Sequence, residues 1–280
     1  MLNNDMSVAP NAVSFIYQGE TVAFQGVTAN DLILKIMREH GSFYELDVLE
    51  RLHEILNSRT QNSVAVDAGA FIGTHSLFFA KFLGFARVFA FEANPSTYAI
   101  LKQNMEQNGL GEQVKCRNVG LGRMPGWGKS LSENKKNLGM NTVVLVDESA
   151  GDTIAVTTID TELHEDQTSP VALIKIDVEG MELDVVQGAL ETIERDRPVL
   201  CIEAHSAGRL VSLLWSLRKW KYTVADCLGV GAPTYIMRPT GGGALLAAIR
   251  NLVWVIYASV PGGLNIIKWY LKRFAQQLSG

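Results

Sequence analysis

Acidic and glycine residues follow a predicted strand early in the main body of the chain, and their spacing favours one kind of ligand. Residues 64–73 read Val-Ala-Val-Asp-Ala-Gly-Ala-Phe-Ile-Gly, and apolar residues at helical spacing begin at Leu77. This pattern predicts a strand, a tight turn at Gly69 and Gly73, and a helix. Ligands of open α/β sheets bind at the carboxyl ends of strands, where glycine lets them approach the backbone. A dinucleotide fingerprint would read G-x-G-x-x-G. The acid here, Asp67, suits a ligand with a cationic group instead.

A second carboxylate follows the next predicted strand, at residues 87–91. Glu92 ends this strand, and Ala-Asn-Pro follows it. A carboxylate at the tip of the second strand of a nucleotide fold can accept both hydroxyls of a ribose. Together with Asp67, this predicts a nucleoside that carries a charged amino acid and no phosphate, which describes S-adenosylmethionine. The competing interpretation is that many doubly wound sheets have glycine turns and acids at strand ends.

Charged residues interrupt an otherwise apolar strand at residues 171–180, which read Val-Ala-Leu-Ile-Lys-Ile-Asp-Val-Glu-Gly. Because side chains of a strand alternate between its two faces, Lys175, Asp177 and Glu179 share one face. Ionisable groups in such a run are costly unless they are paired or functional. Pairing of Lys175 with Asp177 alone would satisfy this requirement, so the pattern indicates either a structural ion pair or a site.

The following predicted strand, at residues 199–202, carries Glu203 and His205 at its end. Parallel strands bring their carboxyl ends to one edge, so these groups should meet Asp177 there. Convergence of Asp177, Glu203 and His205 on a divalent ion is an alternative, although no residues in the chain have metal-ligand spacing. We therefore expect no metal.

The elements before this body predict an extension at residues 1–57. Residues 13–17 and 21–24 read as a hairpin, Asp31 is placed to cap a helix, and residues 46–56 form a second amphipathic helix. The extension either covers the mouth of the cofactor site or packs against the edge of the sheet.

A third predicted strand, at residues 114–119, would place Val119 and Gly120 near an adenine ring. Residues 120–140 are rich in glycine, asparagine, serine and lysine, which predicts a long exposed loop. Such loops are usually functional or disordered, so Trp127 and Asn141 are candidates for substrate contact. Residues 142–146 and 153–159 read as a strand pair.

Composition limits the class of protein and its partners. The chain has 280 residues, of which 47% are hydrophobic and 19% charged, as expected of a folded α/β protein. A net charge of −4 argues against a general nucleic-acid binder, which would need a basic surface. The three cysteines lie far apart and read as lone thiols. The N-terminus has no apolar run, so we expect cytoplasmic residence.

The last forty residues differ from the rest of the chain. They contain four cations and no acid, so residues 1–240 carry a net charge of −8. Residues 245–260 are almost continuously apolar and are followed by Pro-Gly-Gly, after which residues 266–274 mix aromatic and cationic residues. Three interpretations remain: a membrane span, for which the run is short; a basic amphipathic segment lying on an anionic bilayer; or a helix that packs on the domain or on a second subunit. A peripheral membrane contact or a homo-oligomer contact would involve residues 244–275.

Three motifs together resemble the FkbM-type methyltransferases, a branch of the class I S-adenosylmethionine-dependent enzymes. The most specific motif is Ile-Lys-Ile-Asp-Val-Glu-Gly-Met-Glu at 174–182, followed by Gly188 and Ala189. The other two motifs are residues 66–73 and 91–95, and Phe-Tyr-Glu at 43–45 is also similar to the family. The resemblance runs from about residue 41 to residue 239, and the basic tail lies outside it. One departure is Phe71, where the family tends to have a polar residue such as asparagine.

The resemblance implies an α/β fold with a doubly wound, mostly parallel, Rossmann-like sheet of seven strands. The domains are then 1–57, the methyltransferase domain at 58–240, and a helical tail at 241–280. It also implies methyl transfer from S-adenosylmethionine to a hydroxyl of a small molecule, sugar or polyketide. The alternatives are methylation of an amine or a nucleic acid, and a non-catalytic cofactor-binding module that recruits a partner.

Within this scheme Asp177 is the expected base, Lys175 tunes it and His205 is the second candidate, because a positioned base helps an alcohol to lose its proton. The expected cofactor set is Asp67, Gly69, Ala70, Gly73, Thr74, Glu92, Ala93, Asn94, Val119, Gly120 and Asp177. The substrate set is Glu45, Trp127, Asn141, Glu179 and Glu203.

Overall fold

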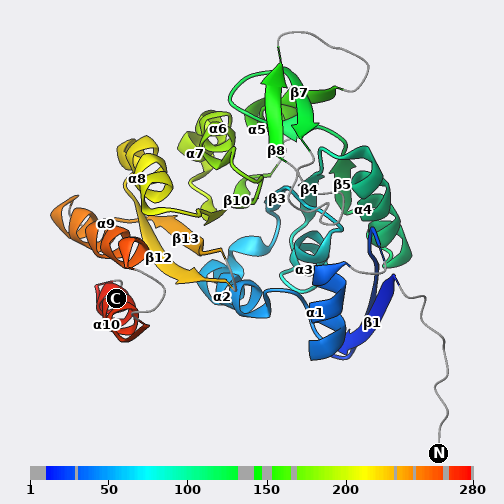
Figure 1. Cartoon of the computed structure of the whole chain (residues 1–280), viewed down its shortest axis with the longest axis horizontal. Coiled ribbons are helices and arrows are strands. Elements are labelled where there is room, and N and C mark those ends of the chain that lie inside the picture. The colour runs from blue at the N-terminus through cyan, green and yellow to red at the C-terminus, as the bar shows by residue number, and fades with distance from the viewer. Residues whose placement is uncertain are drawn as a thin grey trace, which may run out of the picture.

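A seven-stranded sheet forms the centre of the protein in a computed structural model, which describes residues 11–28, 31–131, 142–146, 153–164, 169–229, 232–241, 244–260 and 265–278 (Figure 1). The strand order is β12-β13-β11-β10-β3-β4-β5, and only β13 runs antiparallel to its neighbours. This confirms the predicted doubly wound, mostly parallel sheet. Its strands are β3 (Val64–Ala68), β4 (Arg87–Phe91), β5 (Val114–Arg117), β10 (Val171–Ile176), β11 (Val199–Glu203), β12 (Tyr222–Leu228) and β13 (Thr234–Pro239).

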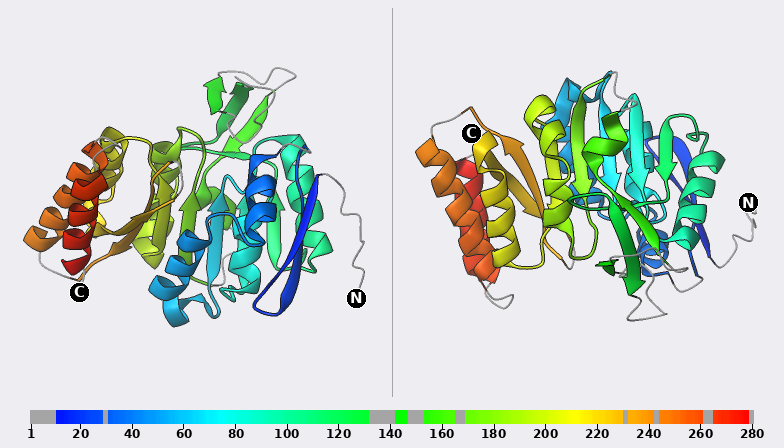
Figure 2. Two further views of the ribbon diagram at one scale, coloured as in Figure 1. Left: turned by 60° about the horizontal axis from the view of Figure 1, so that its bottom comes forward. Right: turned by 90° about the horizontal axis from the view of Figure 1, so that it is seen from above.

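Helices cover both faces of this sheet, and each face has its own apolar core (Figure 2). The helices of one face are α1 (Leu32–His40), α2 (Leu46–Leu56), α3 (Thr74–Lys81) and α4 (Pro95–Gln107). Those of the other face are α5 (Ile159–His164), α6 (Glu182–Gln187), α7 (Leu190–Asp196) and α8 (Ala207–Ser216), with short 3-10 turns at Asn57–Thr60 and Arg218–Trp220. Adjacent residues of β3 belong to opposite cores, Ala65 to the first and Val66 to the second. The strand is therefore apolar throughout because both of its faces are covered.

The N-terminal extension forms the predicted hairpin, β1 (Ala12–Tyr17) and β2 (Glu20–Gln25), and the two predicted helices α1 and α2. Asp31 caps α1 as expected, since its side chain accepts hydrogen bonds from the backbone N–H groups of Ile33 and Leu34. The hairpin is fixed to α4 by Asn104, whose side chain accepts from the N–H of Gln25 at 2.8 Å and donates to its carbonyl at 2.9 Å. Thus the hairpin packs on the main domain.

The expectation of a long loop at residues 120–140 is wrong for the part of it that the structure describes. Short strands β6 (Gly120–Leu121) and β7 (Gly126–Leu131) form a separate sheet with β9 (Ile154–Thr157) and β8 (Thr142–Val146), in the order β6-β9-β7-β8. The two strands expected to pair with each other, β8 and β9, instead lie on either side of β7. Glycine-rich composition predicted a loop, but pairing with β9 satisfies the backbone groups of residues 126–128.

Two helices form the C-terminal tail, α9 (Ala244–Ser259) and α10 (Asn265–Gln277), shown in orange and red in Figure 1. Both pack against the edge strand β12. Asn251 of α9 accepts a hydrogen bond from the N–H of Val224 at 3.1 Å, and Lys272 of α10 donates to the carbonyl of Cys227 at 2.7 Å. No helix among the described residues is long and apolar enough to cross a membrane.

Candidate active site

A glycine turn joins β3 to α3 and lies against the end of β10. Gly69 and Gly73 have φ angles of +80° and +91°, which L side chains rarely adopt. A Cβ on Gly69 would lie 1.8 Å from the carbonyl oxygen of Asp177, and one on Gly73 would lie 2.6 Å from Cε of Met105. The absence of a side chain at Gly69 thus lets the turn meet the end of β10 closely, and its absence at Gly73 lets the turn pack against α4.

Asp67 and Lys175 form a buried ion pair beneath this turn. They are direct partners in the register of β3 and β10, so their side chains lie on the same face of the sheet. Lys175 Nζ lies 3.6 Å from Asp67 Oδ1 and donates to Asp177 Oδ2 at 3.2 Å, while Ser76 Oγ donates to Asp67 Oδ2 at 2.6 Å. Asp67 is 0% exposed. This corrects the expectation that Asp67 itself meets the cation of a ligand: its carboxylate holds Lys175.

The charge on Lys175 is stabilised although the side chain is buried. Burial alone would lower the pKa of Lys175, but the negative charges of Asp177, Asp67 and Glu45 outweigh that effect and raise the pKa above its ordinary value. Lys175 is therefore a fixed cation between the turn and the end of β10.

Asp177 and Glu203 form a hydrogen-bonded carboxyl pair at the ends of the neighbouring strands β10 and β11. Burial, together with the charge of Asp177, raises the pKa of Glu203 to about 9. Burial would also raise the pKa of Asp177, but Lys175 and the hydrogen bond from Glu203 outweigh it and lower that pKa. At neutral pH, Glu203 is thus protonated and donates to an ionised Asp177.

Two further titratable residues border this pair. His205 Nε2 lies 3.4 Å from Glu203 Oε2, and the His205 side chain is 42% exposed. Glu179 has a φ of +49° in the turn after β10, and burial and the charge of Asp177 raise its pKa. The structure therefore brings together the predicted residues of β10 and β11, as the shared edge of the sheet requires.

Glu92 supports the glycine turn from the end of β4. Its Oε2 accepts a hydrogen bond from the N–H of Phe71 at 3.1 Å, and its Oε1 accepts from the N–H of Asn94 at 2.8 Å. Burial and the nearby charges of Asp67 and Asp177 raise the pKa of Glu92 to about 7 despite these hydrogen bonds. Each carboxylate oxygen has a second lone pair for another donor. The side chain of Asn94, also expected at the cofactor, instead caps α4 by accepting from Ser96 and Thr97.

The extension adds residues to the site that sequence reasoning did not connect with one another. His75 Nε2 of α3 lies 3.4 Å from Glu45 Oε2, and both side chains are almost fully buried. Burial raises the pKa of Tyr44 to about 12, and the charges of Glu45, Asp177 and Glu203 add to this effect. Tyr44 therefore lies within electrostatic range of Asp177 and Glu203, and Glu45 within that of Lys175, so the extension borders the candidate site. The pairing of Glu45 with His75 spans thirty residues and leaves no local signal in the sequence.

The other predicted residues lie in varied settings. Ala70 is buried in the turn, and Thr74 is buried as the first residue of α3. Val119 packs against the core on the face that α5 to α8 cover. Trp127 is 42% exposed on β7, and Asn141 lies outside the described residues. Ala93 lies near Gly120, because a Cβ on that glycine would be 3.9 Å from its side chain. Within the described part of the chain, no group of three or more His, Cys, Asp or Glu residues could hold a metal ion.

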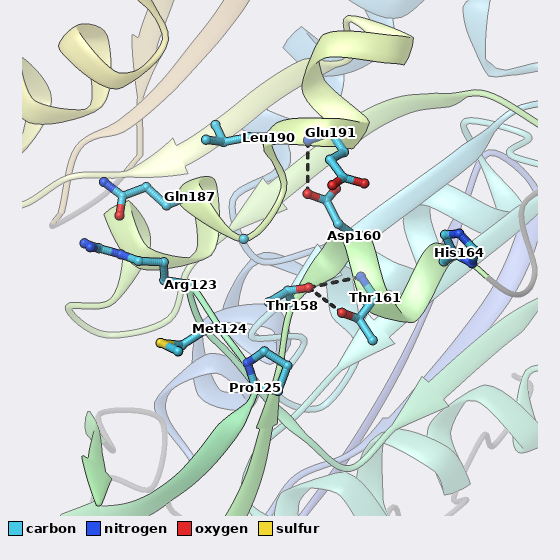
Figure 3. A pocket seen from close by; sticks show the side chains of 11 residues that line it. Arg123, Met124, Pro125, Thr158, Asp160, Thr161, His164, Gln187, Leu190 and Glu191 are labelled. Carbon is cyan, nitrogen blue, oxygen red and sulfur yellow. Dashed lines mark hydrogen bonds between the residues drawn. The ribbon is translucent and has the colours of Figure 1, made fainter.

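A separate pocket of about 560 Å³ lies between the β6–β7 connection, α5 and the start of α7 (Figure 3). Thr158 and Asp160 line it, and Asp160 accepts hydrogen bonds from the N–H groups of Glu191 and Thr192 and from the hydroxyl of Thr192. Asp67, Glu92, Asp177 and Glu203 do not line this pocket. The chemistry-bearing residues therefore gather elsewhere, at the carboxyl ends of β3, β4, β10 and β11.

Comparison with known proteins adds a family to this geometry. The sequence profile of the Methyltransferase FkbM domain matches residues 67–223. "Methyltransferase 1" of Beauveria bassiana is 30% identical over 146 residues, covering 45% of this chain and 58% of that protein. "Hexuronic acid methyltransferase AglP" of Haloferax volcanii is 28% identical over 162 residues, covering 58% of this chain and 63% of that protein. The chain thus spans about three fifths of these relatives.

Among solved structures, that of methyltransferase FkbM from Methylobacillus flagellatus is similar, with 20% identity and a TM-score of 0.45 over 66% of this chain and 47% of that one. The profile match covers more than half of the chain and contains the glycine turn, Glu92, and the carboxyl pair of β10 and β11. The chain therefore belongs to the FkbM methyltransferases.

Proposed function

We propose that this chain is an O-methyltransferase that transfers the methyl group of S-adenosylmethionine to a hydroxyl of a small molecule, sugar or polyketide. The observation that carries the proposal is the partly exposed, ionised Asp177 held between the cation Lys175 and the protonated Glu203. An anionic oxygen fixed in this way is suited to accept a hydrogen bond from a hydroxyl group.

The residues around the turn fit the proposed cofactor. Glu92 offers free lone pairs to the two hydroxyls of a ribose while its other lone pairs hold the N–H groups of Phe71 and Asn94. Asp177 and Glu179 supply negative charge close to the turn, which favours a ligand that carries an ammonium and a sulfonium group. When bound, S-adenosylmethionine supplies an electrophilic methyl group.

The proposed reaction needs an oriented hydroxyl and a place for its proton. Asp177 accepts the hydrogen bond of the acceptor hydroxyl and takes its proton as the C–O bond forms and the bond between the methyl group and the donor's sulfur breaks. Glu203 keeps the anion oriented through its own hydrogen bond, and Lys175 donates to Asp177 Oδ2 at 3.2 Å. His205, 3.4 Å from Glu203, links the pair to solvent for release of the proton. Most of the rate acceleration then comes from positioning.

The acceptor class rests on a relative. The Haloferax volcanii protein is named for hexuronic acid, so hydroxylated sugars and sugar acids are the first acceptors to test. An acidic chain, with a net charge of −4, does not favour a nucleic-acid substrate.

The test is transfer of a labelled methyl group from S-adenosylmethionine to a panel of sugars, sugar acids, polyketides and amines. We expect Asp177→Asn, which keeps the shape of the side chain, to lower kcat about 100-fold or more. Asp47→Asn, the same change at an exposed position of α2, should keep wild-type activity. Transfer to amines alone, or full activity of Asp177→Asn, would contradict the proposed reaction.

We also propose cytoplasmic residence. Its support is that Cys116, Cys201 and Cys227 are free thiols, as is usual in a reducing compartment. Cell fractionation tests it, and cleavage of the protein by a protease added outside intact cells would contradict it.

A further inference from the structure

The outer face of the C-terminal tail exposes large apolar side chains in a regular row. Leu245, Ile249, Leu252 and Ile256 of α9 follow each other at helical spacing and are all exposed, Leu252 by 58%. Trp269 and Phe274 on the neighbouring helix α10 are about half exposed. These six residues are called the tail patch below. Single exposed apolar side chains are ordinary in soluble proteins, but a row of them on one helix face marks a surface that binds a partner.

The opposite face of α9 already has its packing partner. Trp254 is fully buried, and Arg250 is buried with its guanidinium donating to Thr223 Oγ1 at 3.2 Å and to the carbonyl of Leu278. Asn251 binds the backbone of β12 through both ends of its amide. The helix is therefore fixed with the tail patch outward, and no rotation of α9 could bury the patch without exposing Trp254.

The charged groups beside the tail patch are cations, and several stack on aromatic rings. Arg273 lies over the ring of Trp269 at 5.1 Å, and Lys268 lies over Tyr257 at 5.2 Å. Trp215 of the adjacent helix α8 is also exposed, and Arg218 of the following 3-10 turn lies 4.1 Å from its ring. The residues described in α9 and α10 include no Asp or Glu.

From these observations we infer that the tail patch docks the protein on the surface of an anionic phospholipid bilayer. Aliphatic side chains in one row with tryptophan and cations beside them match the acyl boundary and the headgroup level of a membrane interface. Anionic headgroups complement Lys268 and Arg273. The long side chains of these cations let their charges reach the headgroups while the aromatic rings beneath them lie nearer the acyl chains. Because no described helix can cross a membrane, contact is confined to the surface.

A second copy of the chain is the competing occupant, and the charges disfavour it. A two-fold interface places the same patch on both sides, so it would bring the cations of two tails together without a carboxylate from either tail. Anionic lipid has no such conflict. Docking does not depend on the proposed methyl transfer.

The experiment is sedimentation of the full chain with vesicles of phosphatidylcholine alone and with vesicles that also contain phosphatidylglycerol. We expect binding to the anionic vesicles, weaker binding to the neutral ones, and a loss of binding as salt is raised. Leu252→Glu should weaken binding about tenfold or more. Arg273→Gln should weaken it about fivefold, on anionic vesicles alone. Ile16→Glu is the matched control, since Ile16 is an aliphatic residue on β1 that is 70% exposed, and should bind as the wild type does.

Three results would overturn the inference. The first is a wild-type protein that does not sediment with anionic vesicles, and the second is equal binding by Leu252→Glu and wild type. The third combines two measurements: light scattering shows that the wild type is a dimer and that Leu252→Glu is a monomer, while neither of them binds vesicles. This result would assign the tail patch to a second copy of the chain. Circular dichroism and the thermal midpoint of each variant establish that it is folded.

Discussion

Replacing Lys175 with methionine should strongly destabilise the protein, because the lysine is the buried cation between two carboxylates. Its Nζ lies 3.2 Å from Asp177 and 3.6 Å from Asp67. At an effective dielectric constant of about 20, each contact gives about 5 kcal/mol of gross attraction, and dehydration of the three groups offsets most of it. Removing only the cation leaves the Asp67 charge buried and unpaired, which costs about 3–5 kcal/mol.

The loss in Lys175→Met should depend on pH in a direction fixed by the pKa shifts. In the wild type the pKa of Asp177 is lowered, so its contribution to stability is present above the unfolded pKa and is lost as pH falls. Without Lys175, burial dominates and the folded pKa of Asp177 rises, so the variant is relatively more stable in acid. The difference in unfolding free energy between the two proteins should therefore shrink from pH 7 to pH 5, by about 1 kcal/mol or more.

Urea denaturation at both pH values measures these differences. Lys219→Met is the matched control, because Lys219 pairs with Glu194 at 2.9 Å on an exposed surface and should cost at most about 1 kcal/mol. A loss below about 1 kcal/mol for Lys175→Met at pH 7, or a loss that does not change with pH, would refute the reasoning.

Three further predictions concern the glycine turn, the pair of Asp177 and Glu203, and the start of α7. Gly69→Ala should lower the unfolding free energy measured in urea by about 3–4 kcal/mol, because its Cβ would meet the Asp177 carbonyl at 1.8 Å. Gly84→Ala, at a glycine with a similar φ and open space, should lower it by only about 1–2 kcal/mol. Equal losses in the two variants would contradict the clash. Glu203 has its pKa raised from 4.5 to about 9, so its contribution to stability is complete below pH 4.5 and is lost as pH rises through 9. As pH rises from 6 to 9, the unfolding free energy of Glu203→Gln should therefore increase relative to that of the wild type. If the unfolding free energies of the two proteins change with pH in parallel, Glu203 is not protonated. Asp160→Ala removes the acceptor for the N–H groups of Glu191 and Thr192 in the first turn of α7 and should lower the unfolding free energy by about 1–2 kcal/mol. An unchanged thermal midpoint would exclude that role.

Local pattern was enough to predict the strands that carry the candidate site, whereas the seven-stranded sheet was predicted from the family resemblance. Alternation and apolar runs predicted β3, β4, β10 and β11, and the parallel arrangement then required their terminal acids to meet. Asp31 was recognisable as a cap because capping depends on neighbours two and three residues away.

Contacts between distant segments could not be predicted in the same way. The pairing of Lys175 with Asp67 depends on the register between β3 and β10, and the contact of Glu45 with His75 depends on how the extension folds back. The small sheet was missed because glycine-rich composition favours a loop, while its stability comes from pairing between strands far apart in sequence.

The central claim is that the carboxyl ends of β3, β4 and β10 bind S-adenosylmethionine, and calorimetric titration with this compound tests it most directly. We predict micromolar binding by the wild type and at least about tenfold weaker binding by Glu92→Ala, which loses the acceptors for the ribose. Glu112→Ala, an exposed glutamate before β5, should bind as the wild type does. A folded wild-type protein that does not bind S-adenosylmethionine, or a Glu92→Ala variant that binds it equally well, would contradict the account.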